Sequence, residues 1–74
     1  MAYKEKIAVD PDIMLGKPII KGTRITVETI LRKLSEGVTI NELLEAYPHL
    51  TKENILTALS YSADVISKEE LIAT

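Results

Sequence analysis

The segment from Gly16 to Val27 constrains the fold of this chain more than any other part of it. Its sequence is Gly-Lys-Pro-Ile-Ile-Lys-Gly-Thr-Arg-Ile-Thr-Val, which holds two of the chain's 3 glycines and one of its 3 prolines. Glycine permits turns that need a positive φ, and proline keeps the residue before it extended. Two turns therefore flank a short strand at Ile19-Ile20. We predict a tightly turned β element that leads directly into a helix.

An earlier short strand is predicted at Ile7-Ala8-Val9, because Asp10-Pro11-Asp12 follows it as a turn. A two-stranded hairpin is at best marginally stable alone. We therefore expect this β arm to pack on the rest of the chain.

Apolar residues at helical spacing predict three helices after the arm. Thr26 caps the first helix and Gly37 ends it. Thr39 and Glu42 form a capping box that opens the second helix, and Pro48 ends that helix. The apolar stripe of the first helix consists of Val27, Ile30, Leu31 and Leu34, and that of the second consists of Ile40, Leu43, Leu44 and Tyr47.

The third helix is predicted to begin after Thr51, a second threonine cap. Ser67-x-x-Glu70 is another capping box, which predicts a break at Ile66–Ser67 and a short final helix from Lys68 to Ala73. We expect the buried side of the third helix to hold Ile55, Ala58, Leu59 and Ser62, and its outer face to show Glu53, Thr57, Ser60 and Asp64, flanked by Asn54 and Tyr61.

These elements predict a mainly α fold: a three-helix, helix-turn-helix bundle with a short N-terminal β arm or hairpin and a short C-terminal helix. The 74 residues make one domain. We divide it into an arm (5–26), a trihelical core (27–65) and a C-terminal segment (66–74).

Composition limits the possible functions. A chain this short buries only roughly 60% of its unfolded surface, yet 46% of its residues are apolar. Such a surplus usually ends in a protein–protein contact, so we expect a homodimer or larger homo-oligomer, or another partner. There is no cysteine and one histidine, which predicts no enzyme, no metal and no cofactor. No apolar run is long enough for a membrane span and no signal peptide precedes the domain, so a soluble cytoplasmic protein is expected.

Charge is uneven along the chain. Residues 1–37 carry seven cations and five acids, whereas residues 38–74 carry two cations and six acids. This pattern is compatible with a nucleic-acid face and a protein face, and equally with ordinary solvated charge. The outer face of the third helix, with two carboxylates and no arginine, is a poor reader of base edges. The residues that could contact DNA phosphates are Lys17, Lys21, Arg24, Arg32, Lys33 and Lys52.

Several apolar residues near the C-terminus exceed what three short helices need to bury. An amphipathic, acidic segment of this kind can lie in the groove of a partner, or fold back on its own domain. The candidate partner-binding residues are Leu56, Val65, Ile66, Leu71 and Ile72.

The chain also resembles a family of small bacterial and archaeal proteins known as domain of unknown function 433. The resemblance spans about residues 5 to 63. It rests on Ile7-x-x-Asp10-Pro11-x-Ile13-x-x-Gly16-Lys17-Pro18-Ile19-Ile20-Lys21-Gly22-Thr23-Arg24-Ile25-x-Val27, and on Gly37-x-x-x-x-Glu42-Leu43-Leu44, Tyr47-Pro48-His49-Leu50-Thr51 and Ile55-x-x-Ala58-Leu59-x-Tyr61.

The resemblance implies a homeodomain-like helix-turn-helix fold whose β extension mediates dimerisation. It also implies the antitoxin of a type II toxin–antitoxin pair, beside a ribonuclease-like toxin of the PIN type. Such a toxin holds its metal in a cluster of acids, and Arg24 and Lys21 are the candidate groups to insert there. The tail from Asp64 onward lies outside the family's pattern, and we expect partner choice to reside in it.

Two hypotheses follow. The first is a non-enzymatic, dimeric antitoxin-like protein that binds a small toxin, with operator DNA as a further partner. The alternative is a stand-alone, dimeric helix-turn-helix regulator that binds DNA through the basic arm.

Overall fold

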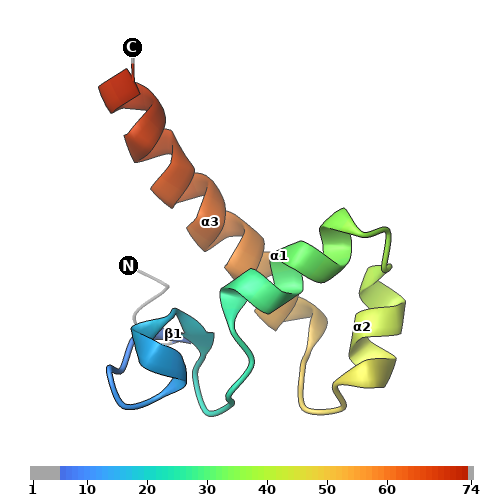
Figure 1. Cartoon of the computed structure of the whole chain (residues 1–74). Coiled ribbons are helices and arrows are strands. Elements are labelled where there is room, and N and C mark those ends of the chain that lie inside the picture. The colour runs from blue at the N-terminus through green and yellow to red at the C-terminus, as the bar shows by residue number, and fades with distance from the viewer. Residues whose placement is uncertain (1–5, 74) are drawn as a thin grey trace.

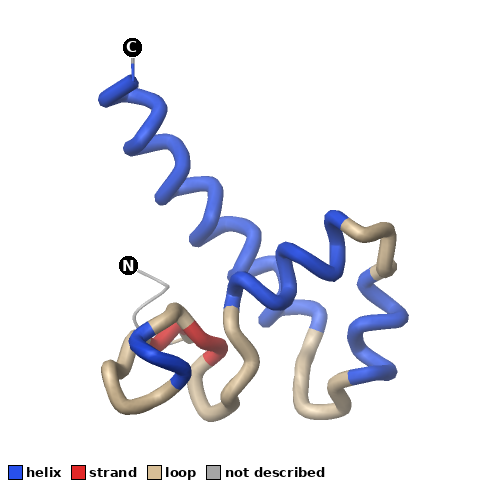
Figure 2. The backbone as a smooth tube through the Cα atoms, viewed as in Figure 1, coloured by secondary structure: helices blue, strands red, loops and turns tan. Residues whose placement is uncertain are grey.

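Two short strands and three helices follow one another along the chain in the computed structural model (Figure 1). The structure describes residues 6–73, with side chains described from 6 to 68. In chain order the elements are β1 (Ile7–Ala8), a single turn η2 (Met14–Gly16), β2 (Ile19–Ile20), α1 (Val27–Ser35), α2 (Ile40–Ala46) and α3 (Lys52–Ala73). Helix dominates the described backbone, and both strands lie in the N-terminal arm (Figure 2).

The arm is an antiparallel pair in which Ile7 faces Ile20 and Ala8 faces Ile19. The chain then turns back at Lys21-Gly22-Thr23, and an isolated bridge joins Ile19 to Thr26. Ile7, Ile19 and Ile20 are all buried. The expectation that the arm packs on the rest of the chain is therefore confirmed: Ile7 and Ile20 lie in the same apolar cluster as the helices.

Side-chain caps fix where each helix begins, as predicted. The hydroxyl of Thr26 accepts from the N–H of Thr29 at 2.9 Å at the start of α1. Thr39 and Glu42 form the expected capping box at α2. At α3, Thr51 Oγ1 accepts from the N–H of Asn54 at 3.1 Å, and Asn54 Oδ1 accepts from the N–H of Thr51 at 3.0 Å. An amide can thus replace the glutamate of a capping box.

Gly37 ends α1 with a φ of 93°, a left-handed conformation that glycine adopts without steric cost. The core then forms where the three helices and the arm meet. Ile30, Leu43 and Ile55, one from each helix, are fully buried. The buried cluster consists of Ile7, Ile20, Val27, Ile30, Leu43, Leu50, Ile55 and Ala58. The mainly α fold with its three helices and N-terminal hairpin is confirmed.

The predicted break at Ile66–Ser67 is wrong, because α3 runs without interruption from Lys52 to Ala73. There is consequently no separate short helix at the C-terminus. Neither glycine nor proline occurs within those residues, and a serine with helix-forming neighbours is tolerated inside a helix. Figure 1 shows the result: the C-terminal half of α3 projects beyond α1, α2 and the arm.

The buried side of α3 also differs from the prediction at two positions. Ile55 and Ala58 are buried as expected, but Leu59 is exposed and Tyr61 packs against the core. Tyr61, which was expected beside the outer face, lies partly buried against the core, so the buried face of α3 is rotated away from Leu59. This rotation leaves a leucine on the surface of α3.

Candidate functional site

The six cations predicted to contact DNA do not form one surface. Lys17, in the turn before β2, and Arg32, on α1, both bind Glu28: Lys17 Nζ is 2.8 Å from Glu28 Oε1, and Arg32 Nη2 is 3.1 Å from Glu28 Oε2. The hydrogen bond from Lys17, which has the larger effect, and that from Arg32 hold the pKa of the Glu28 carboxyl below its usual value. Lys33 lines a groove along α1 that Lys17, Glu28 and Arg32 also line. The charges of Lys17 and Arg32 are therefore partly neutralised by their own domain.

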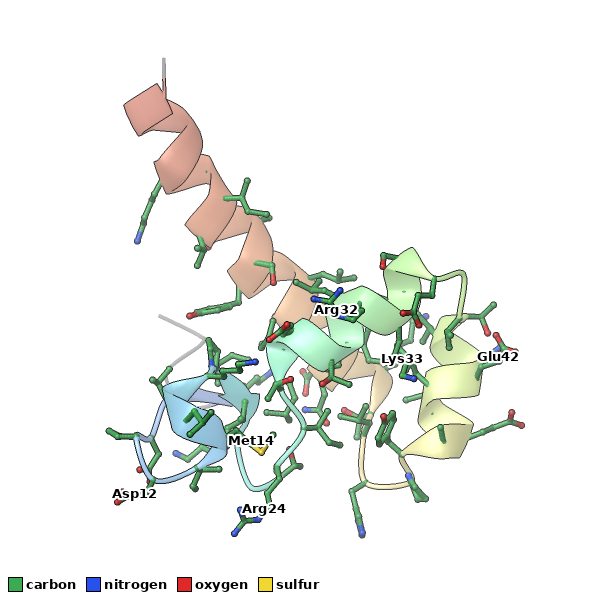
Figure 3. All side chains as sticks on the ribbon, in the orientation of Figure 1. Asp12, Met14, Arg24, Arg32, Lys33 and Glu42 are labelled. Carbon is green, nitrogen blue, oxygen red and sulfur yellow. The ribbon has the colours of Figure 1, made fainter. Side chains whose placement is uncertain are left out.

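Lys21 and Arg24 form a second group with His49. They lie around a hollow between the turn after β2 and the turn that joins α2 to α3, and Lys21, Gly22, Thr23, Arg24, Ile25 and His49 line it. Figure 3 shows Arg24 pointing away from the helices, at the end of the molecule opposite the C-terminus of α3. Nothing in the sequence indicated that His49 lies beside the arm, because this proximity is a tertiary contact between segments that are distant in sequence.

The start of α3 carries less positive charge than the predicted DNA contact at Lys52 requires. Lys52 is exposed there, but the next residue, Glu53, binds Lys6 of the arm at 2.9 Å. Asn54 caps the helix with Thr51. This arrangement offers few donors to the edge of a base pair.

Exposed apolar side chains follow α3 from its N-terminal half into its projecting half. Leu56 is 49% exposed and Ile66 is 59% exposed. With Leu59 and Ala63 they fall at intervals of three, four and three residues, which places them on one stripe of the helix. The side chains of Leu71 and Ile72, the other two candidate partner contacts, lie outside those that the structure describes. We call the stripe Leu56, Leu59, Ala63 and Ile66, together with Val65, the α3 surface.

Val65 shows that the core-facing side of α3 also runs past the end of the domain. It lies seven residues after Ala58, so the two side chains leave the helix in nearly the same direction. Ala58 is fully buried, whereas Val65 is 40% exposed. The apolar face that α3 uses inside the domain thus continues to Val65, which residues 6–68 cover only in part.

A third surface, which the sequence did not indicate, lies at the tip of the arm. Leu15 is 92% exposed and has a φ of 58°, and Met14 before it has a φ of 49°. Left-handed backbone is unfavourable for residues with a Cβ and marks strained, functional segments. Neither methionine nor leucine is a residue type that commonly adopts left-handed backbone, as glycine or asparagine does. Gly16 was therefore the one sign in the sequence of a turn here.

The remaining features of the described residues concern metal ligands, buried polar groups and helices of membrane-spanning length. No group of three or more His, Cys, Asp or Glu side chains gathers there in a way that could hold a metal. Thr26, a buried polar residue, is satisfied because its hydroxyl bonds Thr29. No helix within residues 6–73 is long and apolar enough to cross a membrane.

Comparison with known proteins agrees with the resemblance. The model of a family described as "Protein of unknown function (DUF433)" matches residues 7–62. An uncharacterized protein of Sinorhizobium fredii, y4eO, is 34% identical over 61 residues, which are 82% of this chain and 28% of that protein. An uncharacterized protein of Archaeoglobus fulgidus is 54% identical over 28 residues, 38% of this chain and 78% of that one.

A crystal structure of a DUF433 member protein from Anabaena variabilis has the same fold. It superposes with a TM-score of 0.81 at 30% identity, over 99% of this chain and 73% of that one. The chain spans little more than a quarter of the length of the Sinorhizobium fredii protein.

Proposed function

We propose a function from one premise: the chain belongs to the DUF433 family. We infer that it is a non-enzymatic, antitoxin-like protein that acts in the cytoplasm as a homodimer. Its partner is a small ribonuclease-like toxin of the PIN type, and operator DNA is a second ligand. The homeodomain-like helix-turn-helix character of the three helices forms part of this proposal.

The uncovered α3 surface carries the proposal. An apolar helix face that is buried inside the domain and then continues outside it is what a helix-in-groove contact requires. Fully burying one side chain of the size of Leu or Ile contributes about 1.5 to 3 kcal/mol. Leu56, Leu59, Val65 and Ile66 together are thus enough to anchor a partner at a small interface.

The charge around the α3 surface favours a partner with a basic groove. Asp64, Glu69 and Glu70 accompany a single lysine, Lys68, along the projecting half of α3. Rim charges of one sign steer a partner of the opposite sign and reject others. A toxin with cations beside an apolar groove fits this surface.

The first test is to tag the protein at its native locus and identify by mass spectrometry what co-purifies at equal stoichiometry. The proposal expects a small protein with a nuclease-like cluster of acids, whose ribonuclease activity falls when this chain is added. A clean homo-oligomer with no such protein would contradict the antitoxin function.

The contact itself is tested with Ile66→Asp, and Leu15→Ala at the other end of the molecule serves as the control. Ile66→Asp places a charge in the apolar contact and should abolish co-purification, while Leu15→Ala should retain it. Equal loss with both variants would exclude the α3 surface as the specific site.

The second candidate is a stand-alone, dimeric DNA-binding regulator. The observation that favours it is the hollow around Lys21 and Arg24, two cations that form no ion pair within residues 6–68. Lys21→Glu combined with Arg24→Glu should abolish binding to DNA from upstream of the gene without unfolding the domain. Binding by the unaltered protein that does not weaken with salt would exclude phosphate contacts as its basis.

A further inference from the structure

We propose that the hollow between the turn after β2 and the α2–α3 turn is a binding site for a backbone phosphodiester of a nucleic acid. The site consists of the side chains of Lys21, Arg24 and His49 and the backbone of the turn between Lys21 and Arg24. It rests on the DNA-binding part of the proposed function, and it assigns that binding to two turns rather than to the outer face of α3.

The charge of the hollow is of one sign. Lys21 and Arg24 each carry a full positive charge, His49 adds a ring that can donate a hydrogen bond, and no carboxylate lines the hollow. The other described cations of the arm differ, because Lys17 binds Glu28 and Lys6 binds Glu53. On α1, Arg32 also binds Glu28, whereas Lys33 lies outside the hollow. An anion that approaches the domain is therefore drawn to the hollow before any other part of the arm.

The turn that presents the two cations is held rigidly. The N–H of Thr23 donates to the carbonyl of Ile20 at 3.0 Å, and the Thr23 hydroxyl donates to the same carbonyl at 2.8 Å. That hydroxyl also accepts from the N–H of Ile25 at 3.0 Å. Ile20 is buried, so the base of the turn is fixed in the core. Little conformational entropy is lost when an anion binds to a turn that is already ordered.

Backbone donors are available in the same turn. Gly22 has a φ of 84°, as the third residue of a type II turn requires, and open space surrounds the position of a Cβ there. Among the described residues, none accepts a hydrogen bond from the N–H of Gly22 or from that of Arg24. Free N–H groups of a turn are common ligands of phosphate oxygens.

His49 is held on the opposite wall by a second anchored turn. The N–H of Leu50 donates to the carbonyl of Tyr47 at 2.9 Å, and the side chain of Leu50 is buried. Thr51 then caps α3 together with Asn54. With Leu50 turned inward, its exposed neighbour His49 faces the arm across the hollow.

The chemistry of these groups selects a phosphodiester. Arginine offers two parallel N–H donors to the two free oxygens of a phosphate, and lysine adds a point charge. Both side chains are exposed, so a single free phosphate would bind weakly. A nucleic acid presents many phosphates and releases counterions on binding, which makes a shallow, open site effective.

The experiment measures the binding of a short fluorescent DNA duplex by the full-length protein, by anisotropy, from low salt to about 0.2 M salt. The test variant is Lys21→Gln/Arg24→Gln. The matched control, Lys6→Gln/Lys68→Gln, removes the same charge outside the hollow. A separate His49→Gln variant tests the opposite wall. Circular dichroism confirms that each variant is folded.

We expect the test variant to bind about tenfold or more weakly, and its salt dependence to lose a slope of roughly 2. His49→Gln should weaken binding by less, and the control should bind nearly as well as the unaltered protein. Inorganic phosphate, titrated in ¹H–¹⁵N spectra, should shift the amides of Gly22 and Arg24 before any others.

Other outcomes overturn the site in distinguishable ways. If the test and control variants lose equal affinity, DNA binding stands but the hollow is not its site. If inorganic phosphate shifts these amides while the duplex does not bind, the ligand is a free phosphate and the nucleic acid is excluded. If neither binds at low salt, the DNA-binding part of the proposed function fails as well, while toxin binding is unaffected.

Discussion

Lys17 Nζ lies 2.8 Å from Glu28 Oε1, which ties the turn before β2 to the first turn of α1 across eleven residues of sequence. The same carboxylate binds Arg32 one turn further along α1. Glu28 thus links the arm to the helix that follows it. The pair also withdraws Lys17 from the set of cations that are free to contact a ligand.

Acid should weaken the fold through Glu28 and Glu42. Hydrogen bonds from Lys17 and then Arg32 lower the pKa of Glu28 below its ordinary 4.5, and those from the backbone and side chain of Thr39 lower that of Glu42. In the unfolded chain both return to their ordinary values, so the unfolded state binds more protons. Their contribution to stability is therefore complete above about pH 4.5 and is lost as the pH falls through the folded-state pKa values. Urea unfolding between pH 6 and pH 3 measures this loss.

A Glu28→Gln/Glu42→Gln variant isolates the two carboxylates, since glutamine cannot titrate. Its free energy of unfolding should depend less steeply on pH than that of the unaltered protein. Glu45→Gln, on the exposed face of α2, controls for the change in charge. An unchanged slope in the double variant would show that other groups govern acid unfolding.

Ile55 and Leu56 are neighbours on α3 with opposite environments, since Ile55 is fully buried and Leu56 is half exposed. Ile55→Val should cost about 1 kcal/mol of unfolding free energy because it leaves a small cavity. Leu56→Ala should change it by less than about 0.5 kcal/mol, and instead weaken the binding of a protein partner. Urea melts and pull-down of the partner separate the two effects. A large loss of stability in Leu56→Ala would show that this side chain belongs to the core.

Leu15→Gly should stabilise the isolated domain. Leu15 holds a φ of 58° and buries almost nothing, so glycine relieves about 1 kcal/mol of backbone strain, less the entropy that it gains in the unfolded chain. Leu15→Ala removes the same side chain but keeps the strain, and should leave the melting temperature nearly unchanged. Thermal melts that rank the two variants in the opposite order would show that the turn is not strained.

Removal of residues 66–74 should leave the domain folded but unable to bind its partner. The buried cluster lies entirely between Ile7 and Ala58, so the truncation removes little that holds the helices together. Circular dichroism and a urea melt test the fold, and co-purification with the toxin tests binding. Retention of the toxin would place the partner site elsewhere.

Local signals predicted most of this fold because each acts within a few residues. Thr26, Thr39 and Thr51 cap the three helices as their positions suggested, and Gly37 ends α1. The break at Ile66–Ser67 failed because a capping box inside a run of helix formers competes with continued helical hydrogen bonding, and loses where no glycine or proline intervenes.

The candidate site was less predictable, because it depends on contacts between distant segments. From the sequence, Lys17 and Lys21 were equal candidates for a DNA contact, but in the structure Glu28 binds Lys17 and not Lys21. The hollow pairs Arg24 with His49, which lie on different turns. The left-handed backbone at Met14 and Leu15 has no residue-type signal. Ion pairing, tertiary proximity and strain are all decided after the chain has folded.

Because α3 is unbroken and is anchored in the core at Ile55, a small tilt of the helix at the core displaces its far end. Eleven residues separate Ile55 from Ile66, a distance of about 17 Å along the helix axis. A tilt of about 10° about Ile55 would move Ile66 sideways by about 3 Å, which is more than closely packed side chains can absorb without losing contact. Lys6 holds the short end through Glu53. A partner seated on the far end of α3 would therefore hold the helix at one tilt relative to the core.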